Sequence, residues 1–104
     1  MNEAEAASKV TVADAPENSR YEARITGTLV GFADYRRTAH AVVFVHTEVQ
    51  DAYRGRGIAS ALGRYALDDA RAAGLRVVAT CPFIAWYIDQ HPEYHELRRE
   101  PAQQ

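Results

Sequence analysis

A short glycine turn holds the residues of this chain that are best suited to bind an anion. Arg54-Gly55-Arg56-Gly57 stands between the apolar run Ala41 to Val45 and a helical pattern that begins at Ile58. Glycine lets the backbone approach an anion closely, the first turn of the next helix presents unpaired N–H groups, and arginine suits phosphate geometry. The turn therefore predicts a site for a pyrophosphate-bearing cofactor, with a plain turn before a helix as the alternative. The residues expected to form it are Arg54, Gly55, Arg56, Gly57, Ile58, Ala59 and Ser60.

Other sites with recognisable spacing fit less well. A nucleotide P-loop would need a Gly-Lys-Ser/Thr ending, which the turn lacks. A Rossmann fingerprint follows the first strand of a parallel sheet, whereas several strands precede this turn. A metal site is not predicted, because Pro92 interrupts the i, i+4 spacing of His91 and His95 and no third ligand is evident.

The turn is expected to be positioned by a series of strands that precede it in the chain. Alternation and β-branched content predict strands over residues 10–13, 20–25, 29–35 and 39–46. Thr26-Gly27-Thr28 predicts a tight hairpin, and Arg36-Arg37-Thr38 predicts another reversal. The centre of the last strand, Val42 to Val45, is continuously apolar, as expected for a strand covered on both faces.

The strongest helical pattern covers Ile58 to Ala73, and Gly74 is expected to end it. Asp69 falls inside the apolar stripe of this helix and Leu67 falls outside it. The stripe consists of Ile58, Ala61, Leu62, Tyr65, Ala66 and Ala73. Residues 75–80 predict a buried strand, parallel to the 39–46 strand and joined to it by a right-handed crossover.

A second helix is expected to start at Cys81-Pro82 and to run to about His91, where Pro92 stops it. The predicted fold class is therefore α/β (α+β), with antiparallel strands that lead into a βαβ unit and a final helix. One domain over residues 10–97 is expected, between a loose tail over 1–9 and a frayed end over 98–104.

Composition narrows the classes of function. With 104 residues, the chain has room for one core. The net charge of -2 and the pI near 6.0 argue against a nucleic-acid partner. No apolar stretch approaches the roughly 20 residues that span a bilayer, so no membrane partner is expected. The single cysteine cannot form an internal disulfide, which favours a reducing cytoplasm.

The pattern Arg-x-x-Gly-x-Ala, met by Arg54, Gly57 and Ala59, resembles the acetyl-CoA-binding motif of the GCN5-related N-acetyltransferases. Three motifs in order resemble the small, minimal branch of that superfamily, and the resemblance covers roughly residues 10 to 97. The motifs are His46-Thr47-Glu48-Val49, Tyr53 to Ala59, and Cys81-Pro82-Phe83 followed by His91-Pro92-Glu93-Tyr94. A family-typical proline before the turn is replaced by Gln50-Asp51-Ala52, which is expected to change the rigidity of the loop.

The resemblance implies a minimal acetyltransferase fold, acetyl-CoA as cofactor, and transfer of its acetyl group to a small-molecule or peptide amine of unknown identity. The helices that usually cap the acceptor site are missing, which implies an open site. The resemblance also implies that the strand end near Glu48 and Val49 diverges from its neighbour, pairs with the pantetheine arm and polarises the thioester carbonyl. A monomer or a weak homodimer is expected.

An amine acceptor has to lose a proton, since a lysine-like amine has a pKa of about 10.4. Glu48 and His46 are the candidate bases, because residues two apart on a strand point the same way. The alternative is that both are solvated groups at a strand end. Tyr87 resembles the tyrosine that serves as general acid in the wider superfamily, although a core position is as consistent with its sequence.

Cys81 matches a cysteine that, by resemblance, lies near the reactive end of the cofactor. Direct transfer and a covalent acetyl-Cys81 intermediate both remain open, as does a purely buried role. The whole-chain alternatives are a non-catalytic CoA or acyl-CoA-binding module and a structural domain without a ligand.

Overall fold

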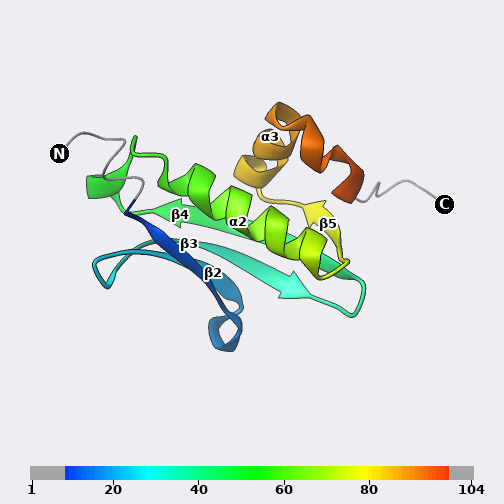
Figure 1. Cartoon of the computed structure of the whole chain (residues 1–104), viewed down its shortest axis with the longest axis horizontal. Helices are drawn as coiled ribbons and strands as arrows, with labels where there is room; N and C mark the ends of the chain where they lie inside the picture. Colours follow the sequence, from blue (N-terminus) through cyan, green and yellow to red (C-terminus); the bar gives the residue numbers. More distant parts are fainter. Residues whose placement is uncertain (1–8, 99–104) are drawn as a thin grey trace.

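A five-stranded sheet in the order β1-β2-β3-β4-β5 forms the base of the computed structural model, which describes residues 9–98 (Figure 1). The first four strands run antiparallel to their neighbours, and the last pairs parallel to β4. They are β1 (Thr11–Ala15), β2 (Arg20–Ile25), β3 (Thr28–Arg37), β4 (Ala41–Val49) and β5 (Arg76–Ala79). This is the predicted mixed fold. Apart from Lys9 and Arg98, the predicted tail over 1–9 and frayed end over 98–104 lie outside the described residues.

Turn residues explain where the strands reverse. Thr26 and Gly27 have φ of 47° and 84°, which is the left-handed pair that a two-residue hairpin needs. The reversal predicted at 36–38 is wrong by about two residues, since β3 runs to Arg37. The Thr38 hydroxyl accepts hydrogen bonds from the amides of His40 and Ala41, so the chain turns only after Thr38.

The helix α2 (Ile58–Ala72) lies across one face of the sheet (Figure 1). Its buried side differs from the predicted stripe: Leu67 is fully buried, whereas Tyr65 is 40% exposed and Ala73 is exposed. The reason is that α2 packs against a second helix as well as the sheet. A Cβ on Gly63 would lie 3.4 Å from Tyr87 Cγ of that helix, so the two helices are in contact here.

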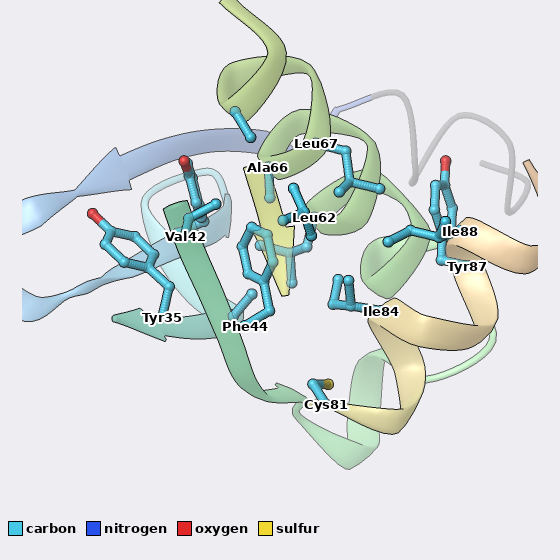
Figure 2. Close-up of a cluster of buried hydrophobic side chains, with 14 of the residues drawn as sticks. Tyr35, Val42, Phe44, Leu62, Ala66, Leu67, Cys81, Ile84, Tyr87 and Ile88 are labelled. Carbon is cyan, nitrogen blue, oxygen red and sulfur yellow. The ribbon is translucent and has the colours of Figure 1, made fainter. Parts of the chain in front are cut away.

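The second helix, α3 (Pro82–Gln90), is followed by a 3-10 segment, η3 (Pro92–Leu97). Figure 2 shows Ile84 of α3 gathered with Leu62 of α2 and Phe44 of β4 in one core. Two shorter 3-10 turns, η1 (Pro16–Asn18) and η2 (Asp51–Tyr53), lie in loops. None of the helices in residues 9–98 has the length and apolar character needed to cross a membrane.

Asp69 interrupts the apolar stripe for a specific reason. Its carboxylate accepts a hydrogen bond of 2.6 Å from the Tyr21 hydroxyl of β2, which joins α2 to the sheet. Tyr94 of η3 donates a similar bond of 2.7 Å to Asp68. The two aspartates thus tie α2 to the sheet on one side and to the C-terminal segment on the other.

Candidate active site

The site begins where β4 and β5 separate. β5 pairs with β4 only along Ala41 to Phe44. The amides of Thr80 and Cys81 then both donate to the Phe44 carbonyl, at 3.1 and 2.9 Å, and the chain turns away into α3. β4 continues from Val45 to Val49, and within residues 9–98 no strand pairs with it on this side, so this backbone edge can accept a ligand. The divergence that the resemblance implied is present.

A bulge at Val45 sets the direction of the side chains that follow. Asp34 of β3 pairs with His46, but Tyr35 pairs with Phe44, which leaves Val45 as the extra residue. Val45 is 38% exposed, so the prediction of a strand covered on both faces is wrong at this residue. After the bulge, His46 and Glu48 point to the face opposite α2, called the outer face here. Thr47 points to the helix side.

A cleft of about 870 Å³ opens between the free part of β4, the glycine loop and the first turns of α2 and α3. All of the predicted site residues line this cleft except Arg56, Cys81 and Tyr87. Its walls are formed by His46, Thr47, Glu48, Val49, Gln50, Asp51, Tyr53, Arg54, Gly55, Gly57, Ile58, Ala59, Ser60 and Phe83.

The glycine loop borders this cleft. Gly55 and Gly57 both have φ of 79°, and Gly57 is the N-cap of α2. The first helical bond runs from the Ala61 amide to the Gly57 carbonyl at 3.0 Å. Within residues 9–98, no hydrogen bond engages the amides of residues 55–60, and no side chain caps the helix. Unpaired amides at a helix N-terminus fit a pyrophosphate.

The two arginines of the loop have different surroundings. Arg54 lines the cleft and pairs with Asp51 at 3.0 Å, with both side chains largely exposed. An exposed pair of this kind is weak, so Arg54 can turn to an anion at little cost. Arg56 lies over the Tyr53 ring, with 5.4 Å between the guanidinium carbon and the ring centroid.

Sequence reasoning missed Gly31 of β3, which lies where the end of β4 meets the start of α2. A Cβ there would lie 3.0 Å from the Glu48 carbonyl oxygen and 3.3 Å from Ile58 Cγ2. Only glycine therefore lets α2 begin so close to the end of β4. A glycine inside a strand often marks such a close approach, which was the available signal.

Sequence reasoning also missed several of the lining residues: Thr47, Gln50, Asp51, Tyr53 and Phe83. Gln50 anchors the loop by hydrogen bonds. Its amide donates to the Val30 carbonyl at 2.9 Å and its side chain donates to the Leu29 carbonyl at 2.6 Å.

The two candidate bases contact each other. His46 Nε2 lies 3.1 Å from Glu48 Oε1, and the side chains are 56% and 60% exposed. Phe32 stands opposite Glu48 on β3, and Asp34 stands opposite His46. The predicted common direction of Glu48 and His46 is thus present, at the rim of the cleft on the outer face.

Cys81 lies beside the cleft rather than in it. It is 3% exposed, and its Sγ lies 3.4 Å from the Thr47 hydroxyl, whose residue does line the cleft. One side chain therefore separates the thiol from the cleft.

Tyr87 lies away from Cys81 (Figure 2) and is not among the residues that line the cleft. Figure 2 shows its hydroxyl pointing away from Cys81, and it borders a separate hollow of about 450 Å³ with Arg64 and Asp68. Its ring stacks on His91 with centroids 3.9 Å apart. Burial raises the pKa of Tyr87, which the positive charge of Arg64 partly opposes.

Comparisons with known proteins agree with this geometry. The GCN5-related N-acetyl-transferase family model matches residues 20–97. Protein NATD1 of Mus musculus is 46% identical over 54 residues, which cover 52% of this chain and 49% of that protein. Protein NATD1 of Homo sapiens is also 46% identical over 54 residues, covering 52% of this chain and 48% of that protein. The chain thus spans about half the length of the curated relatives it matches.

Two solved structures share the fold. The ribosomal-protein-alanine N-acetyltransferase of Brucella melitensis biovar Abortus 2308 superposes with a TM-score of 0.56 at 25% identity, over 82% of this chain and 66% of that one. Ard1 of Thermoplasma volcanium superposes with a TM-score of 0.51 at 23% identity, over 74% of this chain and 54% of that one.

Proposed function

Because the chain belongs to the GCN5-related N-acetyltransferase family, we propose that it transfers an acetyl group from acetyl-CoA to an amine. One observation carries this proposal. The unbonded amides of residues 55–60 and the free edge of β4 border the same cleft. The amides suit a pyrophosphate, and the strand edge suits the amide groups of a pantetheine arm. CoA contains both of these groups.

Within that cleft, the glycine loop would hold the pyrophosphate through its amides, with Arg54 adding a cationic donor. The backbone from Val45 to Val49 would pair with the pantetheine arm and orient the thioester carbonyl. Bound acetyl-CoA would supply a thioester whose carbonyl carbon gains a bond to the amine nitrogen as its bond to sulfur breaks.

Glu48 is the proposed base. A carboxylate that is 60% exposed at the cleft rim can take the proton that the acceptor ammonium must lose. His46, 3.1 Å from that carboxylate, is the alternative base. Both side chains lie on the outer face, where an acceptor of unknown size, a small molecule or a peptide, can approach without crossing α2 or α3.

Direct transfer is favoured over an acetyl-Cys81 intermediate. A nucleophile must reach the thioester carbon, and the Cys81 thiol is 3% exposed behind Thr47. A second candidate function is a non-catalytic CoA or acyl-CoA-binding module. The observation that favours it is the position of Tyr87, the candidate general acid, which is not among the residues that line the cleft.

Two measurements test these functions in order. Thermal unfolding with increasing CoA should show stabilisation of about 2.7 kcal/mol when CoA is at 100 times its Kd. A melting curve that stays unchanged up to millimolar CoA would contradict both binding functions. Consumption of acetyl-CoA with a panel of amines then separates them, because only the acetyltransferase releases CoA in step with acetylated amine. Hydroxylamine-labile mass on Cys81 would overturn direct transfer.

A further inference from the structure

Trp86 is exposed to an extent that the core does not explain. It is the one tryptophan of the sequence and is 52% exposed, more than any other large apolar side chain in residues 9–98. Tryptophan is usually well buried. The residues that α3 buries are Ile84, Tyr87 and Ile88, on a different side of the helix. Trp86 thus contributes little to packing in this fold.

Phe83 connects Trp86 to the cleft. Phe83 lines the cleft, and its ring centroid lies 5.8 Å from that of Trp86 at an interplanar angle of 39°. On its other side, Phe83 Cε2 would be 3.5 Å from a Cβ on Gly63 of α2, so α2 supports this ring. The two aromatic rings form a continuous strip that runs from the cleft wall to the open surface of α3.

The cleft has a place for the phosphates and the pantetheine arm, but CoA also carries an adenine base. A base has a flat π-face that stacks well on an aromatic side chain. Tyr53 is the other aromatic residue that lines the cleft, and the Arg56 guanidinium already lies over its ring, 5.4 Å from the centroid. Trp86, which lies against the cleft-lining Phe83, is therefore the better-exposed aromatic surface beside the cleft.

We propose that the adenine base of CoA stacks on Trp86, with Phe83 holding the indole in place. The proposal rests on the proposed function, because it places a part of the same ligand. It makes Trp86 a determinant of affinity for CoA over ligands that end at the phosphopantetheine. An exposed tryptophan that instead binds a protein partner would leave CoA affinity independent of Trp86.

The single tryptophan makes the test direct. The full chain is titrated with CoA and, separately, with 4′-phosphopantetheine, while tryptophan fluorescence and Kd by calorimetry are recorded. CoA should quench the fluorescence and phosphopantetheine should not. Trp86→Ala should weaken CoA binding about 5- to 150-fold, which corresponds to about 1–3 kcal/mol, and leave phosphopantetheine binding unchanged. Trp86→Phe, which keeps a π-face, should retain most of the affinity for CoA.

Tyr65→Ala serves as the matched control, because Tyr65 is an aromatic residue that is 40% exposed and does not line the cleft. It should leave both affinities and the quenching unchanged. The proposal is overturned if CoA binds the wild type without quenching, or if Trp86→Ala binds CoA as tightly as the wild type. It is also overturned if Trp86→Ala weakens both ligands equally. In these three outcomes the proposed function still stands, whereas absence of CoA binding to the wild type would overturn both.

Discussion

His46 Nε2 and Glu48 Oε1 lie 3.1 Å apart on the outer face of β4. The bulge at Val45 places this pair on the outer face, because it changes which strand residues face away from α2. Both side chains line the cleft and remain more than half exposed, so a proton taken up there has a short path to water. Among the residues that line the cleft, His46 and Glu48 are the imidazole and carboxylate that lie within hydrogen-bond distance of each other.

Replacing Glu48 by glutamine should remove the base while keeping the shape of the cleft. We expect kcat to fall by about 10²- to 10⁴-fold, with the Kd for CoA unchanged, because an amide cannot accept the proton. Steady-state kinetics and calorimetry on Glu48→Gln measure the two quantities. His46→Gln is the companion variant, and its kcat should fall less than that of Glu48→Gln. A larger loss in His46→Gln than in Glu48→Gln would assign the base to His46 instead.

Local signals in the sequence were sufficient for the loop and for the element order. The hairpin at Thr26-Gly27 and the start of α2 after Gly57 depend on residues next to each other in the chain, so the sequence predicts both correctly. The cleft-lining residues from Arg54 to Ser60, apart from Arg56, follow from the same local pattern.

Packing between distant segments decided the features that were predicted wrongly or missed. Leu67 is buried and Tyr65 is exposed, which the periodicity within α2 does not reveal because burial depends on the strands and the helix α3 that pack around it. The bulge at Val45 depends on pairing with β3. Tyr87 is buried against Gly63 of α2 and Tyr94 of η3, and the sequence around it contains no local signal for these contacts.

Gly55 should be needed for binding as well as for folding. Its φ of 79° is left-handed and a Cβ there would meet no atom within 4 Å, so Gly55→Ala adds backbone strain without a clash. We expect a loss of about 1–2 kcal/mol in the free energy of unfolding and weaker CoA binding, because the strained loop turns its amides away from the anion.

Gly27→Ala is the control for that variant. Gly27 has φ of 84° and equally open space, but it lies in the β2–β3 hairpin and does not line the cleft. Urea unfolding should show a similar loss of stability, whereas calorimetry should show wild-type affinity for CoA. Equal CoA affinity in Gly55→Ala and the wild type would contradict the assignment of the loop to the pyrophosphate.

Glu22 should make the protein less stable as the pH falls into the acid range. Its carboxylate accepts a hydrogen bond from Arg20 at 2.8 Å, and further bonds from Arg24 and Asn18. The bond from Arg20 is the largest cause that holds the pKa of Glu22 below its ordinary value of 4.5, while burial partly opposes it. A lowered pKa in the folded state stabilises the protein above the unfolded-state pKa. This contribution is lost as the pH falls toward the folded-state pKa.

Urea unfolding of the wild type and Glu22→Gln between pH 3 and pH 7 measures this effect. The variant should be less stable than the wild type at pH 7, and the difference should shrink as the pH falls below about 4.5. Glu17→Gln, an exposed residue of η1, should leave the profile unchanged. A constant difference between the wild type and Glu22→Gln at all pH values would show that titration of Glu22 does not contribute.

Gly31→Ala should damage both the fold and the cleft. The new Cβ would lie 3.0 Å from the backbone oxygen of Glu48, which cannot move without shifting β4, and 3.3 Å from Ile58 Cγ2 at the start of α2. Overpacking of this kind costs about 1–3 kcal/mol of unfolding free energy. Moving β4 and α2 apart should also weaken CoA binding.

Gly63→Ala tests whether the loss of stability and of CoA affinity is specific to the contact between β4 and the start of α2. Its Cβ would lie 3.4 Å from Tyr87 Cγ, an ordinary contact, and alanine in a helix gains about 1 kcal/mol over glycine. Urea unfolding should therefore show Gly63→Ala as neutral or stabilised, with wild-type affinity for CoA. If Gly31→Ala instead unfolds at the wild-type urea concentration and binds CoA normally, α2 does not need its close approach to β4 for the cleft to form.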